Sequence, residues 1–359
     1  MGLGIQAGKK ECAMKAMVYQ GPGKRDWQEV ADPTLRDDTD AIVRVDAVTI
    51  CGTDLHILKG DVPEVREGTV LGHEAVGTVE QVGSGVKSVR PGDRVLVSCI
   101  SSCGRCEFCR RARYGQCTGG GGWILGHTTD GVQAEQARVP FADTSTYQVP
   151  AGVSDEEVLM LADIGPTAYE VGVLNAGVTP GESVVVVGAG PIGLAAVMAA
   201  RLFSPAHVIV VDPATSRREA ALRFGADAAL DPAEADVARL RELTDGRGLD
   251  VAIEAVGIPE TFEQCAALLR PGGRLANVGV HGAPAQLHLE RLWIRDITVT
   301  TGLVDTYSMP TLLRLLARRQ IDLRPFVTHR FGLDDFEQAY ATFGDAARTE
   351  ALKVVLSRS

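Results

Sequence analysis

The chain has 359 residues and a formal net charge of −10 at pH 7, with a sequence pI of about 5.3. This acidic balance disfavours nucleic acid and anionic membranes as partners, because both select basic patches. No apolar run approaches the roughly 18 residues of a membrane span, so we expect a cytoplasmic protein. At roughly 100–200 residues per domain, the length indicates two domains.

The N-terminal half predicts an irregular, mainly antiparallel β domain. Residues 1–13 show no amphipathic period, and we expect a disordered extension there. Short β runs follow at residues 14–18, 41–45, 76–82 and 94–97, separated by turn residues. In the turn Pro91-Gly92-Asp93, Pro presets φ and Gly accepts a positive φ.

Two short motifs in this half offer metal ligands of mixed type. Cys51-Gly52-Thr53-Asp54-Leu55-His56 and Gly72-His73-Glu74 together provide a soft thiolate, an imidazole and carboxylates. Alone, Cys51 would more often be a buried apolar thiol and His73 a satisfied core histidine. Their occurrence in one chain with the dinucleotide motif described below favours the metal interpretation.

Four of the eight cysteines are closely spaced along one Gly- and Arg-rich stretch. The spacing lets four thiolates from one loop converge on zinc, at Cys103, Cys106, Cys109 and Cys117. Because four cysteines fill a tetrahedral shell, we predict a purely structural zinc site. Disulfides are the rival interpretation, but a chain of this length can fold around its core without them.

After Pro180-Gly181 the pattern changes to alternating strands and helices. Wholly apolar runs at residues 184–187 and 208–211 are typical of a parallel sheet buried on both faces. Further strands are predicted at residues 251–253, 274–278 and 297–301. An amphipathic helix near residues 311–319 and a strand at residues 352–356 complete an α/β second half.

A glycine-rich turn joins the first of these strands to an Ala-rich helix that runs toward Arg201. The turn reads Gly188-Ala189-Gly190-Pro191-Ile192-Gly193. Gly188 makes the tight turn, Gly190 lets the backbone approach a pyrophosphate, and Gly193 lets the helix pack closely on the strand. The sequence therefore predicts a dinucleotide site.

The next apolar strand ends at Asp212, at about the distance of a ribose-binding carboxylate. This carboxylate would accept from both ribose hydroxyls and repel a 2′-phosphate, which favours NAD over NADP. Arg217 and Arg218 keep NADP as an alternative cofactor, because a guanidinium group could pair with the 2′-phosphate. A solvated helix face is the simpler interpretation of both arginines.

In order along the chain, these motifs resemble the zinc-dependent medium-chain alcohol dehydrogenases over nearly everything from Met14 onward. The resemblance implies an α/β chain with a GroES-like irregular β catalytic domain and a Rossmann domain with a doubly wound parallel sheet. It places the catalytic domain at residues 1–164 and 305–359 and the NAD-binding domain at residues 165–304. It also implies two zinc ions per chain, one catalytic and one structural.

The resemblance implies a catalytic zinc held by Cys51, His73 and a third ligand. The matching segment has Asp163 where the horse-liver-type branch has Cys, so Asp163 is the candidate. An Asp before a helix-like run is also a plausible cap. Glu74 is implied as an exchangeable or fourth ligand, or as a carboxylate that orients a ligand. The set, with Trp123 lining the substrate pocket, is similar to bacterial secondary-alcohol dehydrogenases, here combined with structural-zinc cysteines.

The remaining roles also follow from the resemblance. Thr53 and His56 are implied as a proton relay, and Leu125, Ile164 and Trp293 as residues that shape the pocket. The implied cofactor-binding residues are Thr167 near the nicotinamide, Gly188, Gly190, Pro191, Ile192, Gly193 and Lys353 at the pyrophosphate, and Asp212 with Arg217 at the ribose. Lys353 could instead be a solvated lysine at a strand end.

The leading hypothesis is an NAD- and zinc-dependent enzyme that interconverts small alcohols, preferably secondary, with ketones or aldehydes. A threonine- or polyol-type dehydrogenase is a close alternative, and a non-catalytic NAD- or zinc-binding protein is an alternative of another class. We expect a homodimer or homotetramer, with residues 297–304 as an edge strand that pairs across a two-fold axis.

Overall fold

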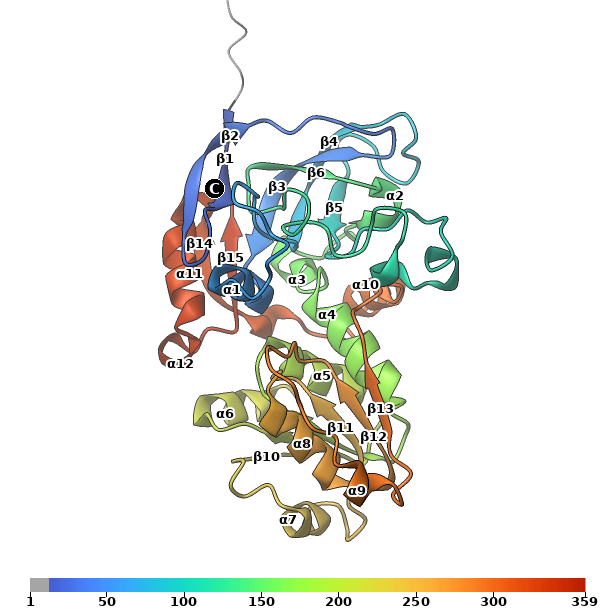
Figure 1. Ribbon diagram of the computed structural model, residues 1–359. Helices are drawn as coiled ribbons and strands as arrows, with labels where there is room; N and C mark the ends of the chain where they lie inside the picture. The colour runs from blue at the N-terminus through green and yellow to red at the C-terminus, as the bar shows by residue number, and fades with distance from the viewer. Residues whose placement is uncertain (1–12, 359) are drawn as a thin grey trace, which may run out of the picture.

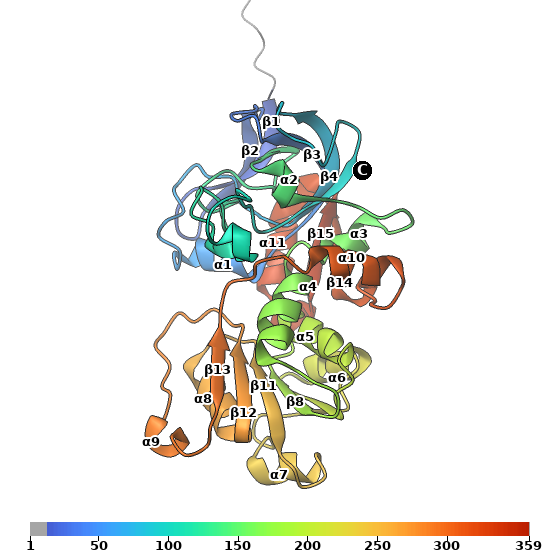
Figure 2. The ribbon, with the colours of Figure 1, turned by 90° about the vertical axis from the view of Figure 1, so that its right-hand side faces the viewer.

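The structure is a computed structural model that describes residues 13–358. It consists of two bodies, an irregular β body and an α/β body, stacked end to end (Figures 1 and 2). The expected disordered extension lies outside the described residues, except for Ala13, which begins the first strand. Among the described residues, no helix combines the length and apolarity needed to cross a membrane.

The α/β body is built on a six-stranded parallel sheet in the order β10-β9-β8-β11-β12-β13. This is the doubly wound order of dinucleotide-binding sheets, with the first strand, β8, near the middle. Every residue of β8 and β11 is buried, because helices cover both faces. The strands are β8 (Ser183–Val187), β9 (His207–Val211), β10 (Ala228–Leu230), β11 (Leu249–Glu254), β12 (Leu269–Asn277) and β13 (Thr298–Thr301). The helices are α5 (Pro191–Arg201), α6 (Thr215–Arg223), α7 (Val237–Glu242), α8 (Pro259–Leu268) and α9 (Leu289–Leu292).

The β body holds a seven-stranded sheet in which β3 pairs with β4, β6 and the C-terminal β15. The chain therefore returns to this body after crossing the α/β body (Figure 1). The strands are β3 (Ala41–Thr49), β4 (Ala75–Val82), β5 (Arg94–Val97), β6 (Gln136–Val139), β7 (Thr146–Gln148), β14 (Val327–Gly332) and β15 (Lys353–Ser357). A separate ribbon pairs β1 (Ala13–Tyr19) with β2 (Arg25–Ala31). The helices are α1 (Gly52–Lys59), α2 (Ala142–Ser145), α3 (Asp155–Leu159), α10 (Met309–Ala317), α11 (Phe336–Gly344) and α12 (Ala346–Thr349).

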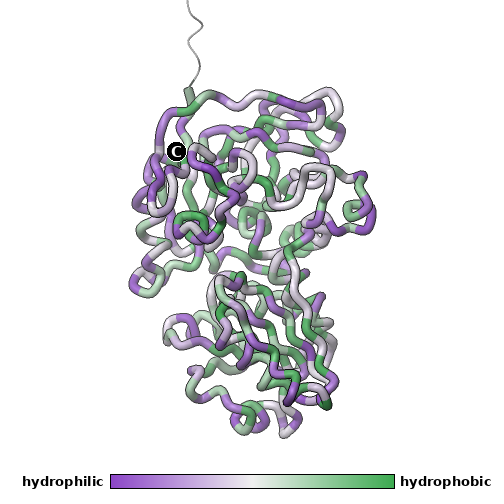
Figure 3. The backbone as a smooth tube through the Cα atoms, in the orientation of Figure 1, coloured by the Kyte–Doolittle hydropathy of each residue, from purple (hydrophilic) through white to green (hydrophobic). Residues whose placement is uncertain are grey.

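One continuous helix connects the two bodies. It begins as α4 (Ile164–Thr167) and continues as a π-helical segment, Ala168–Leu174. A single apolar core runs through this junction and contains residues of both sheets, such as Leu96 and Val184. In Figure 3, strands of the lower sheet carry long apolar stretches, whereas many outer loops are hydrophilic.

The predicted α/β class, with an irregular β body and a doubly wound parallel sheet, is confirmed. The strand predicted at residues 274–278 begins earlier, at Leu269, because Leu269 already pairs with Leu249 across a register shift. The strands that the pattern missed, such as β2 and β10, are short or half-exposed, so neither shows a buried apolar run. The domain boundaries at residues 164/165 and 304/305 stay a prediction.

Candidate active site

Four predicted metal ligands from three distant segments converge near the junction of the two bodies. Cys51, His73, Glu74 and Asp163 each place one ligand atom within 4.8 Å of the others. Cys51 is the N-cap of α1, His73 and Glu74 directly precede β4, and Asp163 is the N-cap of α4. The loop after β3, the loop before β4 and the turn between α3 and α4 therefore meet at one place in the fold.

Asp163 faces the other ligands instead of capping its helix. Its Oδ2 lies 3.5 Å from the Sγ of Cys51 and 3.5 Å from the Nε2 of His73. Its Oδ1 accepts a hydrogen bond of 2.6 Å from the Thr167 hydroxyl, one helical turn later. Within the described chain its carboxylate accepts no backbone N–H bond at the helix end. The cap interpretation is therefore wrong, and Thr167 orients Asp163.

The protonation of this cluster also fits a cation site. Burial raises the pKa of the Cys51 thiol, and the nearby carboxylates of Asp163 and Glu74 raise it further. Burial opposes the charged forms of His73 and Asp163. Their mutual hydrogen bond nevertheless holds the pKa of His73 well above its usual range and lowers the pKa of Asp163 to about 2. The raised pKa values of Cys51 and His73 favour protons on these two groups, whereas Asp163 keeps its negative charge, and a thiol, an imidazole and a carboxylate are together a donor set of the kind that binds zinc.

Glu74 and Lys353 form a buried ion pair beside this cluster. The Nζ of Lys353 donates to both carboxylate oxygens of Glu74, at 2.8 and 3.0 Å, and to the carbonyl of Ile50 at 3.1 Å. Both side chains are only 1% exposed. These contacts use all three ammonium protons, so Lys353 neither reaches toward a pyrophosphate nor lies in solvent, and both sequence interpretations of it are corrected. The physical reason is that the buried carboxylate requires a cation.

Asp54 is a functional candidate that the sequence reasoning missed. It is fully buried, and its Oδ2 accepts from the backbone N–H of Cys51 at 2.9 Å and from the Gln133 side chain at 3.0 Å. The Tyr340 hydroxyl donates to the Gln133 carbonyl oxygen at 2.7 Å, which fixes the amide. The sequence did contain a signal for Asp54, because an acidic residue three positions after the N-cap of a helix, here Cys51, is typical of a capping box.

Thr53 and His56, the predicted proton relay, lie one turn apart on α1. The Thr53 hydroxyl is 3.6 Å from the Cys51 sulfur. His56 is further out, with its side chain 37% exposed and its Nδ1 2.8 Å from a carboxylate oxygen of Asp61. Residues at i and i+3 share one face of a helix, so this face leads from the ligand cluster to solvent.

The cysteine quartet forms the second cluster of ligand atoms within 4.8 Å. The sulfurs of Cys103 and Cys109, and those of Cys106 and Cys117, are 4.0 Å apart. Four sulfurs at 2.3 Å from a tetrahedral zinc would lie about 3.8 Å apart, so the loop fits this ion. Backbone N–H groups led by that of Cys109 lower the pKa of Cys106 to about 5, which favours its thiolate. The described cysteines form no disulfide.

The glycine-rich turn has the geometry that the sequence predicts. Gly188 has a φ of +97°, and Gly190 caps α5 with Pro191 in the first turn. At Gly193 a Cβ atom would lie 1.8 Å from the carbonyl oxygen of Gly188, so only glycine permits this contact. The turn and the start of α5, including Ile192, leave a positive helix end at the edge of the sheet where dinucleotides bind.

Asp212 follows β9 and stabilises the glycine-rich turn. Its carboxylate accepts from the backbone N–H groups of Ala189 at 2.7 Å and Ala214 at 2.9 Å. Arg217 is half-buried and donates to the carbonyl of Ala351 at 2.7 Å, so it is not on a solvated face. Its second terminal nitrogen is buried without a partner among the described residues. This leaves a donor near Asp212 for a ligand.

Of the predicted pocket residues, Trp123 is beside the predicted metal ligands and Trp293 is not. The Trp123 ring meets the His73 ring edge to face, with centroids 6.2 Å apart. Leu125 and Ile164 are buried in the two main apolar cores. Trp293 is 74% exposed at the end of α9, on the part of the α/β body far from the β body (Figure 1). The prediction that it shapes the pocket is therefore wrong for this chain.

Comparison with known proteins agrees with this architecture. Residues 37–151 match the alcohol dehydrogenase GroES-like domain, and residues 191–318 match the zinc-binding dehydrogenase family. An alcohol dehydrogenase of Cupriavidus necator is 37% identical over 365 residues, covering 96% of this chain and 98% of that protein. An L-threonine 3-dehydrogenase of Pyrococcus abyssi is 33% identical over 309 residues, covering 84% of this chain and 87% of that protein.

A solved structure shows the same fold over almost the whole chain. Zinc-dependent alcohol dehydrogenase 2 from Streptococcus pneumonia, in its apo form, superposes with a TM-score of 0.92 at 48% identity, covering 96% of this chain and 99% of that one. The fold and the identity over nearly full lengths agree with the two ligand clusters and the glycine-rich turn. The chain belongs to the zinc-dependent medium-chain alcohol dehydrogenase family.

Proposed function

We propose that this protein is an NAD-dependent, zinc-dependent dehydrogenase that interconverts small secondary alcohols and ketones and also reduces aldehydes. The observation that carries the proposal is the convergence of Cys51, His73 and Asp163 while Lys353 neutralises Glu74. Three protein ligands leave one position of a tetrahedral ion for a substrate oxygen, as in catalytic zinc sites.

The chemistry divides between the bound groups and the side chains of this chain. Zinc in this site would supply a Lewis acid that makes an alcohol hydroxyl more acidic, and NAD would accept the hydride from the carbinol carbon. Thr53, beside the Cys51 sulfur, takes up the hydroxyl proton as its own hydroxyl proton moves on, and His56 passes a proton to solvent. Thr167 orients Asp163 through its hydroxyl. In the reverse direction the same residues return a proton to the oxygen of the ketone.

Asp212 supports NAD over NADP as the cofactor. Its carboxylate lies directly after β9 and is fixed by two backbone N–H groups, so it would repel a 2′-phosphate from a defined position. Arg217 carries a buried nitrogen without a partner among the described residues, which fits a donor to a ribose hydroxyl. The cofactor preference is tested by comparing NADH with NADPH in the assay below.

A threonine- or polyol-type dehydrogenase is the second candidate. It is favoured by the 33% identity to an L-threonine 3-dehydrogenase over 84% of this chain. Such substrates carry a second polar group, so a polar contact near the metal ligands would support it. The predicted homodimer or homotetramer is supported by the place of β13 at the sheet edge, with Val299 and Leu303 partly exposed. The assembly and the cytoplasmic location stay predictions.

The test combines metal analysis with kinetics on Asp163→Ala. We expect two zinc ions per parent chain and NADH oxidation with ketones. The variant should lose one zinc and at least about 100-fold in activity, because removing a ligand costs no less than removing its hydrogen-bond partner. Asp322→Ala, which removes a surface carboxylate paired with Arg324, is the matched control and should keep both. A parent that binds NAD but only one zinc, and reduces no ketone or aldehyde, would indicate a binding protein instead.

A further inference from the structure

A buried carboxylate organises the loop after β11. Glu254, the last residue of β11, is fully buried. Its Oε1 accepts hydrogen bonds from the backbone N–H groups of Val256 at 2.9 Å and Gly257 at 2.8 Å, and from the Thr261 hydroxyl at 2.7 Å. Its Oε2 is buried and has no hydrogen-bond partner within the described part of the chain, and the Nε2 of His281 lies 3.7 Å away. Glu254 therefore holds the loop after β11 with one oxygen and faces the loop after β12 with the other.

His281 is joined to the end of β12 through Asn277. The Nδ2 of Asn277 donates to the carbonyl oxygen of Gly279 at 2.9 Å, which leaves its Oδ1 for His281. The Nε2 of His281 lies 2.9 Å from this Oδ1, and because an amide oxygen only accepts, Nε2 carries the proton. The His281 ring also meets the Phe262 ring of α8 edge to face, with centroids 6.0 Å apart. His281 thus fixes residues 278–281 as one turn.

The loops after β8, β11 and β12 lie in close contact at the carboxyl ends of the parallel strands, where dinucleotides bind. A Cβ atom added at Gly188, in the glycine-rich turn, would lie 2.6 Å from the Val256 side chain and 3.0 Å from the carbonyl oxygen of Ala255. A Cβ atom added at Gly257 would lie 2.3 Å from the carbonyl oxygen of Val280. The glycine-rich turn thus contacts the loop after β11, and that loop contacts the loop after β12, so the position of each constrains the next.

The loop after β12 also reaches the neighbourhood of the predicted metal ligands. Val278 packs on the same small apolar cluster as Trp123, whose ring meets that of His73. Hydride transfer requires the nicotinamide to lie within roughly 3–3.5 Å of the reacting carbon of the alcohol. A dinucleotide held at the glycine-rich turn must therefore extend its nicotinamide half past residues 278–281 to reach a substrate at the metal ligands.

We propose that His281 is a positioning residue for the nicotinamide half of the cofactor, because its hydrogen bond to Asn277 fixes the turn of residues 278–281 against which this half binds. The inference rests on NAD as the cofactor in the proposed function. His281 takes no part in hydride or proton transfer. Without its hydrogen bond the turn must be ordered when the nicotinamide half binds, and that cost weakens binding. The ADP-ribose half, held at the glycine-rich turn, does not carry this cost.

The test compares the binding of NAD⁺ with that of ADP-ribose, which lacks the nicotinamide. Dissociation constants are measured by calorimetric titration for the zinc-loaded parent, for His281→Ala and for His281→Gln. Alanine removes the donor to Asn277, whereas the glutamine amide can supply an N–H group in place of the histidine Nε2. We expect NAD⁺ to bind His281→Ala about 10-fold more weakly, as one lost buried hydrogen bond predicts, and ADP-ribose to stay within about twofold of the parent. His281→Gln should bind both ligands nearly as the parent does.

His288→Ala is the matched control for these titrations. His288 lies in the same connection between β12 and β13, its side chain is 34% exposed, and it pairs with Glu263 and Glu290 instead of Asn277. The control should leave both dissociation constants unchanged. If His281→Ala does not fold, His281→Phe takes its place, because a phenyl ring fills the same space and lacks the donor.

Other outcomes overturn the inference or the proposed function separately. Equal weakening of NAD⁺ and ADP-ribose in His281→Ala, or no change in either, would show that His281 does not act on the nicotinamide half. A His281→Gln variant as weak as His281→Ala would remove the hydrogen bond as the cause. A parent that binds neither ligand would overturn NAD as the cofactor and the inference with it. A parent that binds both ligands but oxidises no alcohol would overturn the proposed activity alone, and the difference between the two ligands still decides the inference.

Discussion

At the residue scale, the ligand cluster joins groups whose protonation depends on one another. His73 and Asp163 hold each other in charged forms although both are buried, and the Cys51 thiol is kept protonated by burial and by two carboxylates. The sequence identified all three residues. It did not show that Lys353 neutralises Glu74, because the two residues are 279 positions apart.

This coupling predicts how zinc uptake depends on pH. The pKa of His73 is raised well above its usual range, so in the metal-free protein its ring keeps a proton to higher pH than an ordinary histidine does, and zinc must displace that proton. We expect affinity to fall as the pH drops through this raised value, and zinc binding to release protons. Calorimetric titration of metal-free protein in two buffers of different ionisation enthalpy measures the release. Asp163→Ala is the control, and equal proton release from both proteins would contradict the prediction.

At the scale of elements, two glycines of the glycine-rich turn have different roles, one in packing and one in ligand binding. Gly193 touches the carbonyl oxygen of Gly188, whereas a Cβ atom at Gly190 would meet no atom within 4 Å among the described residues. Gly190 also has an ordinary φ of −70°. The two glycines therefore do different work, although both belong to one motif.

Substitution of each glycine by alanine tests this division. Gly193→Ala should lower the unfolding free energy by about 3 kcal/mol, because the backbone oxygen of Gly188 cannot move out of the way, and should also weaken NAD binding. Gly190→Ala should leave the unfolding temperature near that of the parent and still weaken NAD binding, because the backbone could no longer approach the pyrophosphate. Calorimetry and NAD titration measure the two effects. Normal NAD affinity in Gly190→Ala would place the pyrophosphate elsewhere.

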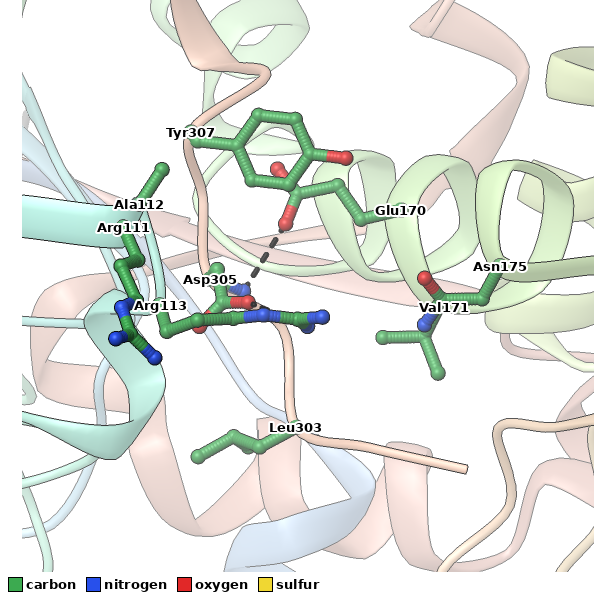
Figure 4. A pocket seen from close by; sticks show the side chains of 9 residues that line it. All are labelled: Arg111, Ala112, Arg113, Glu170, Val171, Asn175, Leu303, Asp305 and Tyr307. Atoms are coloured by element: carbon green, nitrogen blue, oxygen red, sulfur yellow. Dashed lines mark hydrogen bonds and ion pairs between the residues drawn. The ribbon is translucent and has the colours of Figure 1, made fainter. Parts of the chain in front are cut away.

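At the scale of the whole molecule, Glu170 ties the linker after β13 to the helix that joins the two bodies. Its carboxylate accepts from the backbone N–H groups of Asp305, Thr306 and Ser308 at 2.8–3.0 Å and from the Ser308 hydroxyl at 2.5 Å. Asp305 in turn accepts from the Gly115 N–H at 2.9 Å, in the loop of the cysteine quartet. Glu170 and Asp305 line a cavity of about 250 Å³ (Figure 4), whose other lining residues are Arg111, Ala112, Arg113, Val171, Asn175, Leu303 and Tyr307.

Removal of the Glu170 carboxylate should destabilise the junction between the two bodies. Glu170→Ala leaves three buried backbone N–H groups unpaired, and we expect a loss of about 3 kcal/mol or more in unfolding free energy. Arg113→Ala is the control, because Arg113 is 63% exposed and 3.5 Å from Asp305, so its loss should cost under about 1 kcal/mol. Calorimetric unfolding compares the variants. Equal effects of the two changes would show that Glu170 does not hold the linker.

The sequence by itself determined the features that depend on neighbouring residues. The cysteine cluster from Cys103 to Cys117 and the turn from Gly188 to Gly193 each lie within one short segment. Their geometry therefore follows from the local order of residues. The apolar runs of β8 and β9 likewise predicted a buried parallel sheet. Only the tertiary structure decided that the Asp163 side chain faces the other predicted ligands instead of capping its helix, and that Lys353 neutralises Glu74. These roles depend on contacts that the folded chain makes between distant segments, or on burial that removes water as a partner, and neither is visible in the local order of residues.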